Sequence, residues 1–104
     1  MNKGFGNIMK QAQMMQQKMQ RLQQELEGRE VEATSGGGMV TAKVNGKQQL
    51  LGLKIEPAAV DAEDIEMLED LIIAAFNESV RKAAEAMEKG MEAAKGNLSV
   101  PGLF

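Results

Sequence analysis

This chain of 104 residues contains no histidine and no cysteine, two residue types that carry out much of the chemistry in active sites. The usual general bases and nucleophiles are therefore missing. Three serines remain, Ser35, Ser79 and Ser99, and none has an evident activating partner in the sequence. We identify no catalytic residue and predict that the protein is not an enzyme.

Carboxylates are the remaining groups that could do chemistry, by holding Mg²⁺. A cluster of them lies at the start of the second long helix that we predict: Glu56, Asp61, Glu63, Asp64, Glu66, Glu69 and Asp70. Their spacing is not that of a metal loop such as an EF-hand. Because a helix macrodipole favours negative charge at its N-terminus, we interpret them as a helix start and a solvated face, and predict no metal and no cofactor.

A run of three glycines, residues 36–38, is a second candidate because glycine-rich loops can cradle phosphate. Such loops usually deliver the phosphate to a helix N-terminus, whereas here a strand is predicted to follow. A connection between two strands is the favoured interpretation, although a loop here could still touch a ligand.

Basic residues are concentrated in the first half of the chain. The net charge is −3 and the pI about 5.0, yet residues 1–54 carry eight basic against four acidic side chains, a net of +4, and residues 55–104 carry −7. Lys10, Lys18 and Arg21 form what we call the basic ridge, with Lys3 nearby. Such residues are usually a solvated face, but a dimer would double the ridge, and two projecting helices could straddle a duplex through phosphate contacts.

The ridge requires a helix to display it, and the spacing predicts one over Asn7–Leu26. Its apolar positions alternate four- and three-residue steps: Ile8, Ala12, Met15, Met19, Leu22 and Leu26, which we call the apolar stripe. Lys10 and Arg21 lie almost opposite this stripe and Lys18 about 60° to one side. Met14 lies outside it and is a candidate contact residue. Residues 1–6 are expected to be a flexible leader, and Gly28 to stop the helix.

Three antiparallel strands are predicted next: Glu30–Ser35, Met39–Val44 and a third that ends before Pro57. Asn45-Gly46 predicts a two-residue type I′ turn. That turn would pair Val44 with Lys47, Ala42 with Gln49 and Val40 with Leu51. One face would then carry Val40, Ala42, Val44, Leu51, Leu53 and Ile55, and the polar face would still expose Met39 and Leu50.

A second, longer helix is predicted after Asp61, its expected N-cap. Its apolar positions are Ile65, Leu68, Ile72, Phe76, Val80, Ala83, Met87 and Ala94. At 1.5 Å per residue it would be on the order of 50 Å long, which exceeds the roughly 34 Å diameter of a compact domain of this size. We therefore predict a homodimer that covers the overhang. The expected interface residues are Leu68, Ile72, Phe76, Met39 and Leu50.

The chain as a whole, residues 1–104, is expected to be a single α+β domain, with residues 95–104 as a loose tail. The sequence has no signal peptide and no apolar run long enough to span a bilayer. A cytoplasmic protein with no membrane association is the default expectation, and the lack of cysteine suits that compartment.

Five motifs in order along the chain resemble the YbaB/EbfC family of bacterial nucleoid-associated proteins: FGNIMKQAQMMQQKMQ, SGGGMV, NGK, EMLEDLIIAAFNESVRKA and PGLF. The resemblance implies an N-terminal helix, a three-stranded antiparallel sheet and a long C-terminal helix, dimerised into a tweezer-like shape. It also implies DNA contacts along the helices that project as arms. Lys10 and Lys18 fall in the matching motifs, and Arg81 and Lys82 follow AAFNE; Lys3, Arg21 and Lys89 are added on charge.

The third strand departs from the family. It reads QQLLGLKIEP, where some relatives carry a basic pair, and Leu51 and Gly52 cannot replace that charge. DNA affinity is therefore expected to be weaker than in those relatives.

Two functions remain open. The first is a homodimeric nucleoid-associated protein that binds duplex DNA mainly through phosphates and alters its conformation. The second is an adaptor whose arms grip a recombination or replication protein, with incidental DNA contact.

Overall fold

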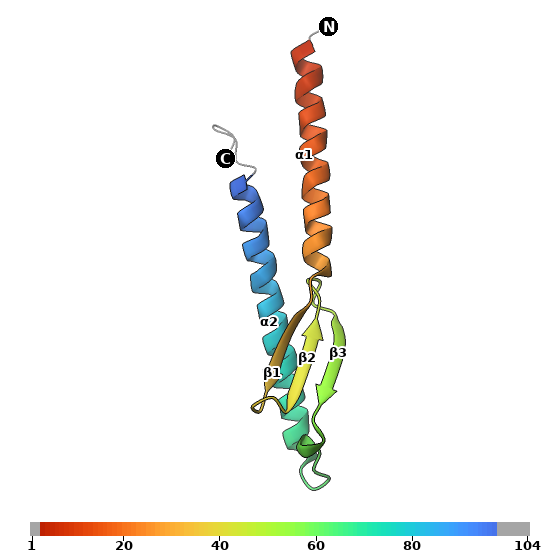
Figure 1. Cartoon of the computed structure of the whole chain (residues 1–104), viewed down its shortest axis with the longest axis vertical. Helices are drawn as coiled ribbons and strands as arrows, with labels where there is room; N and C mark the ends of the chain where they lie inside the picture. Colours follow the sequence, from red (N-terminus) through yellow and green to blue (C-terminus); the bar gives the residue numbers. More distant parts are fainter. Residues whose placement is uncertain (1–2, 98–104) are drawn as a thin grey trace.

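The computed structural model describes residues 3–97 of the chain. Its elements, in chain order, are the helix α1 (Lys3–Gly28), the strands β1 (Val31–Ser35), β2 (Val40–Val44) and β3 (Leu50–Ile55), a short 3₁₀ helix η1 (Pro57–Ala59) and the helix α2 (Ile65–Asn97). The strands form one antiparallel sheet in the order β1-β2-β3. The predicted α+β architecture is confirmed (Figure 1).

Helix α1 begins earlier than its apolar spacing predicted. It is already helical at Lys3, so the expectation of a flexible leader over residues 1–6 is wrong for residues 3–6; residues 1 and 2 lie outside the described part. Gly4 and Gly6 do not stop it, because one glycine inside a helix costs only about 1 kcal/mol and each added residue extends an existing nucleus. Gly28 is its last residue, close to the predicted stop.

The β2–β3 pairing differs from the predicted register. Val40 pairs with Ile55 and Ala42 with Leu53, each four residues further along than expected, and Val44 pairs with Leu50 next to an irregularity in the ladder. Because a shift of four is even, the side chains of β3 near Leu53 keep the face that we predicted.

The turn between β2 and β3 explains this shift. Asn45 accepts backbone N–H groups of Lys47 and Gln49 on its side-chain oxygen, and the left-handed residue of the turn is Gln48, with φ 65°. The loop is therefore longer than the two-residue turn that Asn-Gly predicts. Gly46 is required for another reason: a Cβ atom there would collide with the backbone of Leu26 and Glu27 at the end of α1.

Helix α2 begins at Ile65, later than the predicted cap at Asp61 implied. Asp64 is the N-cap, since its carboxylate accepts the backbone N–H of Met67 at 3.2 Å. Asp61 instead closes the preceding turn by accepting the N–H of Glu63 at 2.9 Å. The helix continues to Asn97, so the predicted loose tail is wrong for residues 95–97, and its remainder, 98–104, lies outside the described residues.

The core lies between α2 and one face of the sheet. Val40, Ala42 and Ala75 are fully buried there, and the partly buried residues packed against them are Ile55, Leu68, Leu71 and Ile72. Small residues on α2 allow this close approach. Ser79 is also buried, and its hydroxyl donates to the carbonyl of Phe76 at 2.7 Å.

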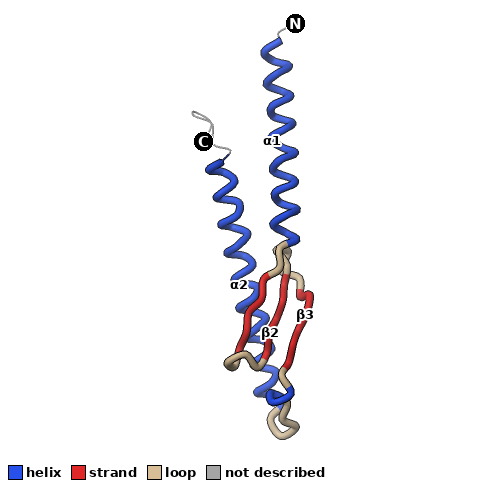
Figure 2. The backbone as a smooth tube through the Cα atoms, in the orientation of Figure 1, coloured by secondary structure: helices blue, strands red, loops and turns tan. Residues whose placement is uncertain are grey.

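The molecule is elongated, with principal extents of 78 × 21 × 15 Å. The N-terminal half of α2 packs against β1 and β2, and its C-terminal half rises beside α1, beyond the sheet (Figure 2). Helix α1 projects further still, past the end of α2 (Figure 1). The two helices are thus arms on a small sheet base. None of the helices in residues 3–97 is long and apolar enough to cross a membrane.

Candidate nucleic-acid interface

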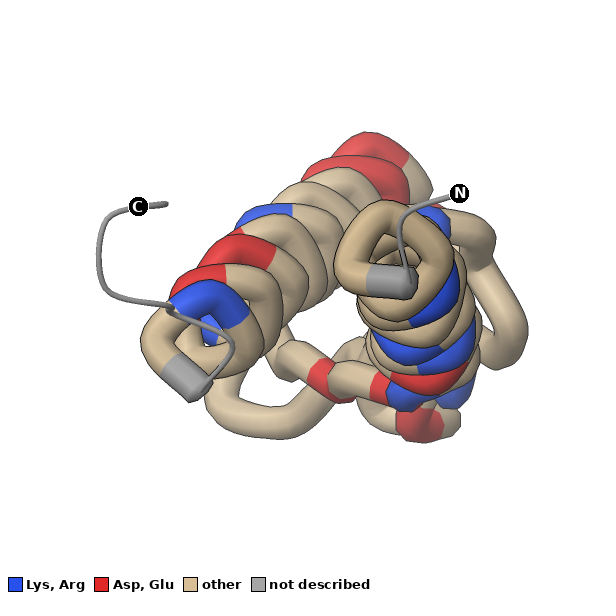
Figure 3. The backbone as a smooth tube through the Cα atoms, turned by 90° about the horizontal axis from the view of Figure 1, so that it is seen from above, with Lys and Arg blue, Asp and Glu red and all other residues tan. Residues whose placement is uncertain are grey.

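The basic ridge lies on the exposed arm α1. Lys10, Lys18 and Arg21 are all exposed, and within residues 3–97 none of them has a carboxylate within salt-bridge distance. Most Lys and Arg positions of α1 lie on the side turned away from α2 (Figure 3). Lys3 is the first residue of the helix. The acidic residues of α1, Glu25 and Glu27, lie in its last turn. The outer part of this arm can therefore approach a polyanion without internal competition.

Arg81, on the other arm, is held between two carboxylates of its own helix. Its guanidinium donates to Glu78 at 2.6 and 3.0 Å and to Glu85 at 3.0 Å. The i,i+3 and i,i+4 spacings place all three side chains on one face of α2. The charge of Arg81, which we predicted to contact DNA, is thus already compensated.

This pairing also changes how the groups titrate. The hydrogen bonds from Arg81 hold the pKa of Glu78 below its usual value of 4.5. The pKa of Glu85 is lowered as well, chiefly by its hydrogen bond with Lys89. The hydrogen bonds with Glu78 raise the pKa of Arg81 further above the physiological range. All three groups therefore stay charged and paired near neutral pH.

The two other predicted cations of α2 differ from each other. Lys89 forms an ion pair with Glu85 at 3.0 Å and so joins the Glu78–Arg81–Glu85 cluster. Lys82 is exposed and has no ion-pair partner among residues 3–97. The predicted contact set therefore divides into unpaired cations, mostly on α1, and paired cations on α2.

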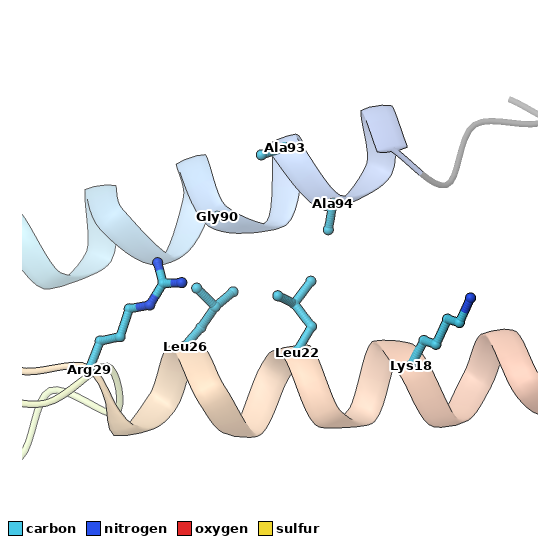
Figure 4. Close-up of a pocket in the computed structure, with 7 residues that line it drawn as sticks. All are labelled: Lys18, Leu22, Leu26, Arg29, Gly90, Ala93 and Ala94. Carbon is cyan, nitrogen blue, oxygen red and sulfur yellow. The ribbon is translucent and has the colours of Figure 1, made fainter.

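The two arms meet at a glycine. Leu26 of α1 is only 3% exposed, and a Cβ atom added to Gly90 of α2 would lie 2.5 Å from its side chain. Above this contact the arms enclose an open groove of about 360 Å³, lined by Lys18, Leu22, Leu26, Arg29, Gly90, Ala93 and Ala94. Ala94 points toward Leu22 (Figure 4). Small residues on α2 thus let the arms approach at their base.

The hairpin turn fixes the base of α1. The backbone N–H of Gly46 donates to the carbonyl of Glu27 at 3.0 Å, and Lys47 forms an ion pair with the carboxylate of Glu27 at 3.8 Å. One of the carbonyls that every helix leaves unsatisfied at its end is thereby paired. The orientation of the basic arm is therefore set by the sheet as well as by α2.

The cations of the sheet are also compensated. Lys43 lies 3.7 Å from both Glu30 and Glu32, and Lys54 lies 3.7 Å from Glu56. Such exposed pairs add little stability, but they reduce the positive field of the sheet. The sheet is therefore a weaker candidate than α1 for phosphate contact.

The glycine run connects β1 to β2, which confirms its interpretation as a connection between two strands. All three glycines have positive φ, a region that other residues rarely adopt. A Cβ atom at Gly36 would lie 2.8 Å from Leu71, so this glycine also allows the turn to approach α2.

The acidic residues before α2 cap its backbone. Asp61 and Asp64 accept backbone N–H groups, as described above. Within residues 3–97, no three acidic side chains converge into a group that could hold a metal ion.

The residues predicted to form a dimer interface lie in two environments. Leu68 and Ile72 pack partly buried against the core of their own chain, and Phe76 and Met39 are also partly buried. Leu50, on the edge strand β3, is 48% exposed. Further apolar side chains that the prediction left out of the interface are exposed as well, among them Leu51, Leu53 and Ile73. The dimer interface stays a prediction.

Of two features that we missed, the sequence contained a signal for one. The order Glu78, Arg81, Glu85, Lys89 follows the spacing of ion pairs along a helix, and predicts that these charges meet each other. The close approaches at Gly46 and Gly90 had no comparable signal, because they depend on where α1 lies in space.

Comparison with known proteins gives a consistent result. A model of the YbaB/EbfC DNA-binding family matches residues 1–98. A nucleoid-associated protein of Alkaliphilus metalliredigens is 50% identical over 100 residues, covering 96% of this chain and 88% of that protein. Another, of Pelotomaculum thermopropionicum, is 47% identical over 104 residues, covering 100% and 99%. The crystal structure of an uncharacterized protein of Helicobacter pylori shares the fold, with a TM-score of 0.56 at 24% identity, covering 85% of this chain and 98% of that one.

Proposed function

Because the chain belongs to the YbaB/EbfC DNA-binding family, we propose that it is a non-enzymatic nucleoid-associated protein that binds duplex DNA mainly through phosphate contacts. It would act on the nucleoid, in the cytoplasm, without a cofactor. Phosphate contacts position a protein on DNA without reading its sequence, so the proposal predicts little sequence preference.

One observation supports this proposal: Lys10, Lys18 and Arg21 of α1 are exposed and have no ion-pair partner among residues 3–97. A cation that is already paired must lose its partner before it can bind a phosphate. An unpaired cation only has to release water, and the phosphate releases its condensed counterions. We therefore assign the main DNA contact to α1, with Lys82 as a lesser contact on α2. Arg81 and Lys89 are not expected to contribute much.

We further propose that the protein acts as a homodimer. Helix α2 packs against β1 and β2, and leaves β3 at the open edge of the sheet. Leu51 and Leu53 on that strand are 49% and 40% exposed, and Leu50 is also exposed. An apolar edge strand of this kind is prone to association. A second copy at β3 would cover it and would place two basic arms on one particle, which could clamp a duplex and change its conformation.

The test is a fluorescence-anisotropy titration of labelled duplex DNA across a series of salt concentrations, with an unrelated duplex as competitor. Three ridge cations per chain give six per dimer, so log K is expected to fall against log salt with a slope of about −5. The unrelated duplex should compete equally well.

A binding constant that is independent of salt would overturn the phosphate mechanism. Failure to bind DNA at low salt would favour the adaptor function instead. Sedimentation of the free protein at micromolar concentration tests the dimer separately, and a monomeric mass would refute it.

A further inference from the structure

The outer half of α1 presents an apolar surface that the described part of the chain does not cover. Ile8 of the apolar stripe is 64% exposed and Phe5 is 62% exposed, and Ala12 is exposed as well. Deeper along the stripe, Leu22 and Leu26 face α2 in the groove between the arms. The stripe thus has a partner near the base of the arm and none, among residues 3–97, near its tip.

The groove between the arms and a second hollow further along α1 share one lining residue. Lys18 lines the groove and also a second hollow of about 230 Å³ on α1, whose other lining residues are Gln11, Met14 and Met15. Ala93 and Ala94 line the groove together with Lys18, and α2 ends three residues later, at Asn97.

The residues that follow α2 suit this surface in composition and length. Residues 98–104 read LSVPGLF, with four large apolar side chains and no charge. Seven residues in extended form span about 23 Å. The stretch of α1 from Lys18 to Phe5 covers thirteen helical steps, or about 20 Å. The segment is long enough to reach the tip of the arm and too apolar to be well solvated.

We propose that residues 98–104 of the same chain bind along the outer part of the apolar stripe, from the hollow at Met15 to Ile8. The segment would run antiparallel to α1 and bury apolar side chains on both sides. Lys10 and Arg21 lie almost opposite the stripe, so these two cations of the basic ridge stay free for phosphate, whereas Lys18 lies beside the segment. The C-terminal segment would then stabilise the tip of the DNA-binding arm. The proposal does not depend on DNA binding.

The first test is hydrogen exchange of the full chain against a chain that ends at Asn97, in the absence of DNA. Truncation should raise amide exchange at Ile8 and Ala12 by about three- to tenfold, because the tip of α1 loses its cover. Exchange near Leu26 should be unchanged, which controls for general unfolding. A full-length variant with serine at positions 98, 100, 103 and 104 should behave like the truncated chain. Equal amide exchange at Ile8 and Ala12 in all three proteins would overturn the proposal. This holds also if the tip of α1 is then protected by a second copy of the chain.

The second test uses the absence of native cysteine. In an extended antiparallel segment, Leu103 is expected to lie near Ile8. The double variant Ile8→Cys with Leu103→Cys should form a disulfide within one chain under mild oxidation. The matched control, Lys10→Cys with Leu103→Cys, puts the thiol at a similar height on the opposite side of α1 and should react at least about tenfold more slowly. Equal rates, or a disulfide that forms only between chains, would overturn the proposal.

Discussion

The two arms of this molecule have similar outlines and different charge arrangements. Residues 3–24 of α1 carry four cations and no acidic residue, whereas α2 carries seven acidic and four basic residues. The ridge of α1 is unpaired, while Arg81 and Lys89 of α2 are bound to Glu78 and Glu85. We therefore expect pairing, as well as the number of cations on a helix, to decide which arm attracts a polyanion.

Two cations that the sequence motifs treat alike, Lys10 and Arg81, have different surroundings in the structure. Sequence motifs placed Lys10 and Arg81 in the same class, because both are basic and both lie on projecting helices. The structure separates them, since Arg81 pairs with glutamates three and four positions away, whereas no acidic residue lies three or four positions from Lys10. An ion pair with an acidic residue three or four positions away changes the expected role of a cation.

The largest effect is expected when the ridge is removed. The triple variant Lys10→Ala, Lys18→Ala, Arg21→Ala should lose about 100-fold or more in affinity for duplex DNA, for all sequences alike, because up to six phosphate contacts per dimer are lost. The slope of log K against log salt should become less negative by about 5. Anisotropy titrations at several salt concentrations measure both quantities.

The matched variant is Arg81→Ala with Lys89→Ala, which removes two cations from the other arm. It should change affinity by less than about threefold, since both charges are already paired. If the two variants lost affinity equally per charge, the difference between the arms would be refuted. All these side chains are exposed, so thermal unfolding should confirm that both proteins remain folded.

One added methyl group at the contact between the arms, where Gly90 packs against Leu26, should lower the stability of the fold. Gly90→Ala places a carbon against the side chain of Leu26 and should destabilise the fold by about 1 to 3 kcal/mol, the range for overpacking a close contact. Gly96→Ala, in the same helix, has nothing within 4 Å of the new carbon and should be neutral or slightly stabilising.

Urea unfolding of the two glycine variants measures this difference. Equal stability would mean that Leu26 moves aside freely, and that α1 is not held to α2 at this point. The more strongly destabilised variant should also bind DNA less well, because the basic arm loses its fixed orientation.

The sequence was sufficient to predict the helices and strands, and insufficient to predict the contacts between them. Periodicity located both helices and all three strands, because an apolar face must repeat with its own element. It failed at the β2–β3 turn, where Asn-Gly predicted a two-residue loop. There Gly46 is needed for its contact with α1, and Gln48 takes the left-handed conformation. Contacts between elements distant in the chain decide such positions, so local pattern cannot reveal them.

The candidate site was only partly predictable for a related reason. The exposure of Lys10 and Arg21 follows from their angle to the apolar stripe, and that prediction is confirmed. Whether a cation forms an ion pair depends on the residues one helical turn away. For Arg81, the spacing of Glu78, Arg81 and Glu85 in the sequence already indicated such pairs. The dimer surface at β3 remains a prediction, since a partner is inferred there only from the exposed leucines.

Removing the carboxylates that pair with Arg81 and Lys89 should make α2 more similar to α1 in its affinity for DNA. The double variant Glu78→Gln, Glu85→Gln frees Arg81 and Lys89, and DNA affinity should rise by about three- to tenfold, with a steeper salt slope. The matched control is Glu88→Gln with Glu92→Gln, which removes the same charge from the same helix. Neither of these carboxylates has an ion-pair partner among residues 3–97. An equal rise in both variants would attribute the effect to net charge and contradict the role of pairing.

The smallest effect concerns pH. The pKa values of Glu78 and Glu85 are lowered in the folded protein, so their ion pairs stabilise it fully above the usual carboxylate pKa of 4.5, and this contribution is lost as pH falls through the lowered values. Between pH 6 and 8 these pairs should therefore not change, and DNA binding should show no pH dependence from them. Carbon NMR of the side-chain carboxylates should place the Glu78 midpoint below 4.5 in the native chain and nearer to 4.5 in Arg81→Ala. An unchanged midpoint in that variant would mean that Arg81 does not pair with Glu78 in solution, and would contradict the compensation of Arg81 by this carboxylate.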